Sequence, residues 1–310
     1  MALPRLRLRD DRWERAIDGI DPVTGAHTIF GILFDRVFPL DLFLSSELGQ
    51  LRTFAVPSIS RLLHSTRQYE DEGRRRVDDT KAILSEIIIP GPRSAGGRAM
   101  MDHLNKIHGH YVISNDDMLT TLAALAVAPI EHVARFAHRP MRPREQAAWY
   151  EVWRQVGVGM GISDVPSRFE ELRDFRDRYE ARVVRFDPAN AAVAQALLAV
   201  LRDELPPALR PLVEPTAVVL LAAPHIAAGL GLRPPTPAER RFILAGLAGR
   251  RVVERKVTAF AHQRFSETRL FRHLPSYPRG YERHMLGPRK LIAKMLAGST
   301  AAARASAAAR

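Results

Sequence analysis

Apolar residues recur at every third or fourth position along most of this chain, which is the spacing of one face of an α-helix. No convincing run alternates apolar and polar residues as a half-buried strand does. The pattern predicts an all-α protein with a single globular helical domain. Prolines and glycines divide it into expected helices at 26–53 (two, divided near Pro39, the second capped by Asp41), 58–66, 76–89, 98–117, 118–136 (broken at Pro129), 142–161, 169–186, 189–205, 216–232 (broken at Pro224) and 238–262.

The two ends of the chain depart from this pattern. Residues 1–25 are polar and expected to be irregular, residues 26–290 form the folded domain, and the Ala-rich segment 297–310 lacks core-forming residues and is expected to be disordered. The first residues have no apolar signal-peptide core. The apolar run 216–232 contains Pro224 and His225, which favours a buried helix over a membrane span. We expect a soluble, cytoplasmic protein.

The composition excludes several classes of metal and redox site and leaves the binding partner open. The chain has no cysteine, which excludes disulfides, zinc–thiolate sites, iron–sulfur clusters and thiolate-ligated haem. A formal net charge of +12 is compatible with nucleic acid, with an anionic membrane surface or with a solvated basic surface. No zinc-finger spacing, RNP motif, phosphate-binding loop or GxSxG elbow occurs, so specific nucleic-acid binding, nucleotide-dependent and hydrolase functions have no support.

The stretch from Arg76 to Asp117 places polar groups on helical faces that should be buried. Arg76 lies one turn before Thr80, and the apolar face of this first half contains Val77, Thr80, Leu84, Ile87 and Ile88. The stripe of the second half contains Met101, Leu104, His108, Tyr111 and Val112. A helix pair that buries an arginine, a hydroxyl and an imidazole must pair these groups with one another or with a bound molecule.

His108 is the central candidate for a bound group. A haem iron takes one neutral imidazole held by a helix, together with an apolar pocket that has a few polar groups. Asn105 and Tyr111 flank His108 by one turn on either side, and Arg76 and Thr80 lie on the neighbouring helix. The alternative is a core histidine bonded to the backbone.

Two other metal arrangements remain open. His103, His108 and His110 do not share one helical face, but together with nearby aspartates they leave a non-haem metal site as an alternative. His225, inside its apolar run, is a second candidate axial ligand.

Several motifs, in this order, resemble those of the mpaB/rubber oxygenase catalytic domain family, which includes latex-clearing proteins. In chain order they are PSISRLLHST at 57–66, RxxxT at Arg76 and Thr80, NKIH at Asn105–His108, IxNDD at 113–117, WRQVGVGMGISDVP at 153–166, and YPRGY and LGP within 277–288. The resemblance covers roughly residues 20–288. It implies a globin-reminiscent helical bundle that holds haem b.

By this resemblance His108 is the proximal iron ligand, and Arg76 and Thr80 lie in the distal or haem-contacting region. In the latex-clearing branch a lysine directly precedes the threonine, whereas this chain has Asp79 there and Lys81 on the other side. Cleavage of polyisoprene itself is therefore not implied. Asp79 is interpreted either as a proton relay on the distal side or as an ion-pair partner of a neighbouring arginine.

We therefore expect a haem-b-dependent oxygenase that activates dioxygen at His-ligated iron and oxidises or cleaves a C=C bond of an apolar substrate such as an isoprenoid. The expected catalytic residues are Arg76, Asp79 and Thr80; the cofactor-binding residues are His108, Arg76, Thr80, Asn105 and Tyr111; the metal ligand is His108. The alternatives are a non-catalytic haem sensor or carrier, and a cofactor-free helical module that binds anionic lipid or nucleic acid. Peripheral contact with an anionic membrane is compatible with the oxygenase hypothesis.

Overall fold

The computed structural model describes residues 6–297 and is helical over most of that range, as the pattern predicted. The segment 297–310, expected to be disordered, lies outside the described residues except for its first position. The helices are α1 (Arg12–Asp18), α2 (Ala26–Ile32), α3 (Pro39–Thr53), α4 (Pro57–Thr66), α5 (Gln68–Ile88), α6 (Ala95–His108), α7 (Asn115–Phe136), α8 (Pro143–Gly159), α9 (Phe169–Val183), α10 (Pro188–Asp203), α11 (Val213–Leu221), α12 (Pro224–Gly229), α13 (Pro237–Lys256) and α14 (Arg269–Arg272). Short 3-10 segments are η2 (Pro207–Leu212), η3 (Phe265–Glu267) and η4 (Arg283–Met285), and one π-helical segment is η1 (Leu33–Val37).

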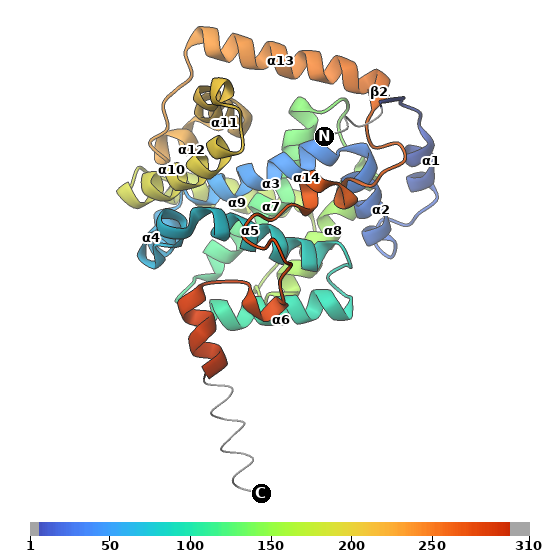
Figure 1. The fold of residues 1–310 in the computed structure, drawn as a ribbon. Helices are drawn as coiled ribbons and strands as arrows, with labels where there is room; N and C mark the ends of the chain where they lie inside the picture. Colours follow the sequence, from blue (N-terminus) through green and yellow to red (C-terminus); the bar gives the residue numbers. More distant parts are fainter. Residues whose placement is uncertain (1–5, 298–310) are drawn as a thin grey trace, which may run out of the picture.

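The helix α7 lies at the centre of the molecule and packs on α3, α8 and α9 (Figure 1). It is long and apolar enough to cross a membrane, but 67% of its most apolar window is buried inside the protein, as in the core helix of a folded domain. The indole N–H of Trp149 on α8 donates to the carbonyl of Ala126 on α7 at 3.0 Å, and its ring stacks on Phe30. These contacts hold α8 against α7 and α2.

A second apolar cluster joins α10, α11 and α12 to the end of α3 and to α5. A buried ion pair connects this side to α9, because both guanidinium nitrogens of Arg52 that face Glu180 donate to its carboxylate, at 2.7 and 2.6 Å. The predicted break of the 216–232 run at Pro224 is confirmed: α11 ends at Leu221, and α12 begins at Pro224.

The long helix α13 crosses one face of the molecule (Figure 1). It is followed by the two-residue strand β2 (Val257–Thr258), which pairs antiparallel with β1 (Arg7–Leu8). Residues 6–25 are thus more regular than expected, since they contain β1 and α1, and Ile17 of α1 is fully buried. Ile17 anchors this mostly polar segment in the core, and the partly buried Trp13 and Ile20 pack there as well.

Three local predictions were wrong. Asp41 does not cap α3; it is buried and ion-paired with Arg250. The helix α7 continues through Pro129, because its packing offsets the one backbone hydrogen bond that a proline removes. The helix α6 ends at His108, so Val112 lies beyond the helix and is fully exposed rather than part of the buried stripe.

Candidate functional site

The helices α5 and α6 pack against each other and position the residues singled out in the sequence. Arg76 on α5 donates a hydrogen bond from Nη1 to the hydroxyl of Thr80, and that hydroxyl donates to the carbonyl of Arg76 at 2.9 Å. The guanidinium carbon of Arg76 also lies 5.1 Å from the ring centroid of Tyr69. Arg76 and Thr80 therefore form one connected unit, as their four-residue spacing predicts.

His108 is the last residue of α6, close enough to Arg76 for the charge of that guanidinium to act on its ring. Its Nδ1 is buried and has no hydrogen-bond partner among the described residues. Burial, and secondarily the charge of Arg76, lower the pKa of His108 to about 4. The imidazole is consequently neutral at pH 7, the form in which it ligates a metal.

Tyr111 and Asn105 adjoin His108 in different ways. Burial raises the pKa of the Tyr111 hydroxyl, and the charge of Arg76 opposes that rise, so Arg76 is an electrostatic neighbour of both Tyr111 and His108. Asn105 donates from Nδ2 to the carbonyl of Gly159 at 3.0 Å and thereby ties the last turn of α6 to the end of α8. Asn105 therefore affects His108 by fixing the helical turn that carries it.

Asp79 belongs to a separate set of contacts. Its carboxylate accepts hydrogen bonds from the hydroxyl of Tyr277 and from the backbone N–H of Gly287 at 3.3 Å, and it lies 3.9 Å from Nε of Arg75. Burial raises the pKa of this carboxyl, although Tyr277 and Arg75 oppose the rise. The contact with Arg75 agrees with the ion-pair interpretation, whereas the contacts with Tyr277 and Gly287, which place Asp79 against the C-terminal segment, were not anticipated.

A hydrogen-bonded chain leads away from the Arg76 unit and was not anticipated. The hydroxyl of Tyr69 donates to Oε1 of Gln50 at 3.1 Å, and Nε2 of Gln50 donates to Glu47 at 3.1 Å. Burial, followed by the charge of Glu204, raises the pKa of Glu47 to about 7. The sequence signal that could have indicated this chain is the pair Glu47 and Gln50, which lie one helical turn apart on α3.

The other histidines considered as ligands have partners of their own. His103 contacts the carbonyl of Leu286 at 2.9 Å, and His110 contacts that of Lys106 at 2.8 Å. His225 lies 3.4 Å from Glu180, and its side chain is 53% exposed. Within residues 6–297, no three or more His, Asp or Glu side chains converge in a way that could hold a metal ion.

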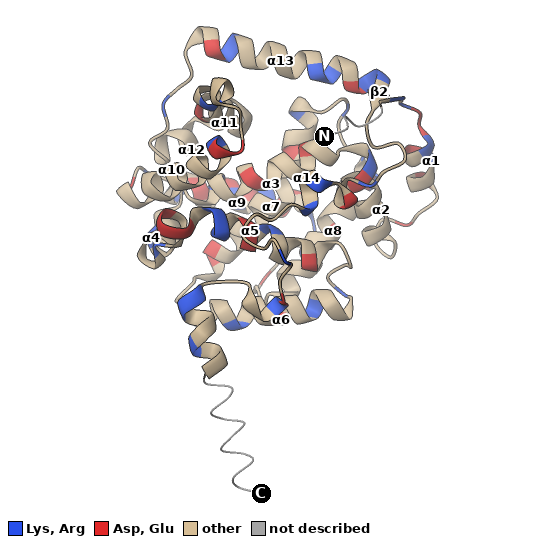
Figure 2. Cartoon of the chain, viewed as in Figure 1, with Lys and Arg blue, Asp and Glu red and all other residues tan. Residues whose placement is uncertain are grey.

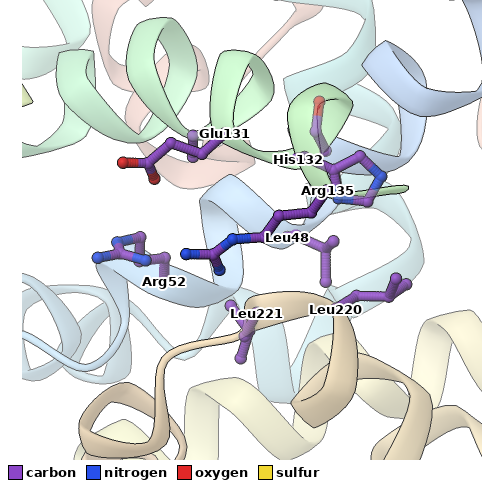
Figure 3. Close-up of a pocket in the computed structure, with 9 residues that line it drawn as sticks. Leu48, Arg52, Glu131, His132, Arg135, Leu220 and Leu221 are labelled. Atoms are coloured by element: carbon purple, nitrogen blue, oxygen red, sulfur yellow. The ribbon is translucent and has the colours of Figure 1, made fainter. Parts of the chain in front are cut away.

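A cavity between α3, α7 and α11 lies apart from His108 (Figure 3). It is lined by Ser45, Leu48, Arg52, Ala128, Glu131, His132, Arg135, Leu220 and Leu221. His132 is 5% exposed, and neither ring nitrogen has a hydrogen-bond partner among the described residues. Burial and the charge of Arg250 lower its pKa to about 4. Neither this cavity nor the more open hollow beside residues 71–75 is lined by His108.

In comparison with known proteins, residues 42–253 match the family model described as ER-bound oxygenase mpaB/B'/rubber oxygenase, catalytic domain. The chain is 30% identical over 193 residues to the ER-bound oxygenase mpaB' of Penicillium brevicompactum, covering 56% of this chain and 46% of that protein. It is 29% identical over 192 residues to the ER-bound oxygenase mpaB of Penicillium roqueforti, covering 56% of this chain and 64% of that protein. The chain therefore spans less than two thirds of the length of these relatives.

Among solved structures, the latex clearing protein in its closed state matches with a TM-score of 0.49 and 17% sequence identity, covering 80% of this chain and 70% of that one. The family match begins in the first turn of α3 and ends near the end of α13. It includes Arg76, Asp79, Thr80 and His108, but not Tyr277 or Gly287.

Proposed function

The chain belongs to the ER-bound oxygenase mpaB/B'/rubber oxygenase catalytic-domain family, and from this premise we propose that it is a haem-b-dependent oxygenase acting on an apolar substrate of the isoprenoid type. The family supports oxygenase chemistry; haem, the substrate class and the roles of individual residues are our proposal. Relatives over the matched region carry the name oxygenase. An apolar substrate agrees with the resemblance to rubber oxygenases.

The observation that carries the proposal is the state of His108. A neutral imidazole whose buried Nδ1 has no partner among the described residues is a costly arrangement for a core histidine, since a buried polar group without a hydrogen bond is destabilising. Haem iron takes a neutral imidazole, so the chemistry of this side chain fits the group. His108 would hold the haem, which when bound supplies the iron that activates dioxygen.

The remaining residues act by charge and position. Thr80 and Tyr69 hold the guanidinium of Arg76, whose positive charge adds to the larger effect of burial in lowering the pKa of His108 and so favours the neutral imidazole. Asn105 anchors the last turn of α6 to α8 and so orients His108. A role for Asp79 in catalysis stays a prediction, and its contacts with Tyr277 and Gly287 favour a positioning role.

The test is a haem titration of the purified protein followed by absorption spectroscopy. The wild type should give a stoichiometric shift of the Soret band, and His108→Ala should abolish it. His110→Ala is the matched control, because His110 is exposed, lies two residues beyond His108, and its ring contacts the carbonyl of Lys106 in the last turn of α6. An unchanged Soret band in His108→Ala would refute the ligand assignment.

Oxygen consumption separates the enzyme from a haem carrier. A haem-loaded protein that consumes dioxygen in the presence of an isoprenoid alkene, with matching oxidised product by mass spectrometry, supports an oxygenase. Haem binding without turnover over a panel of apolar alkenes would instead identify a sensor or carrier. A colourless protein that takes up no haem would contradict both.

A further inference from the structure

The outward face of α13 is unusually apolar for a surface helix. Of its residues only Ile243 is buried, whereas Phe242, Val252, Val253 and Leu244 are 66%, 57%, 54% and 37% exposed. Between Leu244 and Val252 the exposed positions are the small residues Ala245, Gly246, Ala248 and Gly249, while Leu247, Arg250 and Arg251 are partly buried. The other large exposed apolar side chains among the described residues, such as Val112, Val158 and Phe186, are distributed over different elements. Scattered residues of that kind need no explanation, but a cluster on one helix does.

The apolar cluster continues onto the strand next to the end of α13. Leu6 and Leu8 are 63% and 81% exposed, and β1 pairs with β2 directly after the helix. The guanidinium of Arg9 donates from Nε to the carbonyl of Glu254 at 2.6 Å, which fixes β1 against the last turn of α13. The helix and the strand therefore form one surface, defined by Phe242, Leu244, Val252, Val253, Leu6 and Leu8 and called the α13 face below.

Cationic side chains flank this face at both ends of the helix. Figure 2 shows Lys and Arg near the start and toward the end of α13, with a stretch of uncharged residues between them. Arg240, Arg241 and Lys256 are exposed and take part in none of the ion pairs found among residues 6–297. By contrast, Arg250 on the inward side pairs with Asp41 and Glu254. The outward cations are thus free to meet an anionic partner.

We propose that the α13 face docks onto the surface of a lipid bilayer that carries anionic headgroups. A helix that combines exposed apolar residues with Lys and Arg lies in the plane of such an interface, with its apolar side chains among the acyl chains and its cations among the headgroups. The sequence suggested contact with an anionic membrane from net charge alone; the structure assigns that contact to one helix and one strand.

A second copy of the chain fits the α13 face less well than a bilayer does. Two such faces in contact would bring Arg240, Arg241 and Lys256 of both copies together, and like charges across an interface are repulsive. The nearby carboxylates, Glu239 and Glu254, already pair with Arg233 and Arg250. The formal net charge of +12 adds to this repulsion. An anionic bilayer satisfies both the apolar and the cationic parts of the surface.

The first test is co-sedimentation of the whole protein with vesicles of pure phosphatidylcholine and with vesicles containing 30% phosphatidylserine, at about 0.15 M salt. We expect clear binding to the anionic vesicles and weak binding to the neutral ones. Arg240→Ala with Arg241→Ala should weaken anionic binding by roughly 25-fold, since each basic residue near such a surface contributes about fivefold. Arg178→Ala on α9, an exposed arginine of another helix, is the matched control and should change binding less than twofold.

A second pair of variants tests the apolar residues of the α13 face. Phe242→Ser with Val253→Ser should weaken anionic binding by roughly tenfold or more, whereas Val158→Ser with Phe186→Ser should leave it unchanged. All four positions are exposed, so the variants should fold like the wild type, which circular dichroism checks.

Because the chain has no cysteine, a single introduced cysteine can be labelled at one site only. An environment-sensitive fluorophore on Val252→Cys should shift to the blue with anionic vesicles, and the same label on Val158→Cys should not. Equal binding to both vesicle types, equal binding by the Arg240/Arg241 variant, or equal fluorescence shifts at the two positions would overturn the proposal. A protein that does not bind vesicles but forms a concentration-dependent dimer would also overturn the proposal, if Phe242→Ser with Val253→Ser abolishes that dimer.

Discussion

The hydrogen bond between Tyr277 and Asp79 offers a direct measurement of how the C-terminal segment is held on α5. Tyr277→Phe removes only the hydroxyl. Asp79 is 1% exposed and Tyr277 is 7% exposed, so solvent does not screen this bond. A hydrogen bond to a charged partner contributes about 1.5–3 kcal/mol, and Tyr277→Phe should lower the free energy of unfolding by that amount.

A double-mutant cycle with Asp79→Asn isolates the pairwise contribution. Urea unfolding followed by tryptophan fluorescence gives the four free energies, and their coupling should lie at about 1 kcal/mol or above. The ion pair of Asp79 with Arg75 is present in the Tyr277→Phe protein and therefore cancels in the cycle. A coupling energy below about 0.5 kcal/mol would show that the two side chains do not depend on each other.

The same two variants decide between positioning and catalysis for Asp79. If the carboxylate positions the C-terminal segment, both substitutions should lower thermal stability and neither should abolish turnover at low temperature. If it transfers protons to or from the reacting groups, Asp79→Asn should abolish turnover while Tyr277→Phe, which keeps the carboxylate, should not. The second pattern would refute the positioning role.

Three further predictions concern α3 and α13. Because the folded-state pKa of Glu47 is raised from 4.5 to about 7, ionisation opposes folding, and its cost of up to about 3 kcal/mol appears as pH rises from 4.5 through 7. Glu47→Gln should therefore gain stability relative to wild type across that window in urea titrations, and a pH-independent difference would contradict the assigned pKa. Gly49→Ala should cost about 1–3 kcal/mol, because the added Cβ would lie 2.7 Å from the carbonyl of Ala124. Gly246→Ala should raise stability by about 0.5–1 kcal/mol, since its Cβ would meet nothing within 4 Å; equal melting shifts for the two glycine variants would disprove the close approach of α3 and α7.

Local information in the sequence predicted the helices well. The spacing of apolar residues depends on near neighbours, so α8, α9 and α10 begin and end within a few residues of the expected bounds. It also predicted that Arg76 and Thr80 lie together, because side chains one turn apart share a helical face.

Contacts between distant segments could not be predicted in the same way. Asp41 was interpreted as a cap from its position after Pro39, but its partner Arg250 lies on α13. Asp79 was interpreted within its own helix, but it accepts hydrogen bonds from Tyr277 and Gly287. Local spacing contains no information on which remote segment will cover a given carboxylate.

The pairing of β1 with β2 has a consequence for synthesis in the cell. Arg7 pairs with Thr258, so β1 must wait for a partner strand that is synthesised much later. Closing so long a loop costs chain entropy that only late contacts can offset. The central helices can assemble on the ribosome while Leu6 and Leu8 remain without their neighbour. The residues of β1 thus stay available to chaperones until β2 has been synthesised.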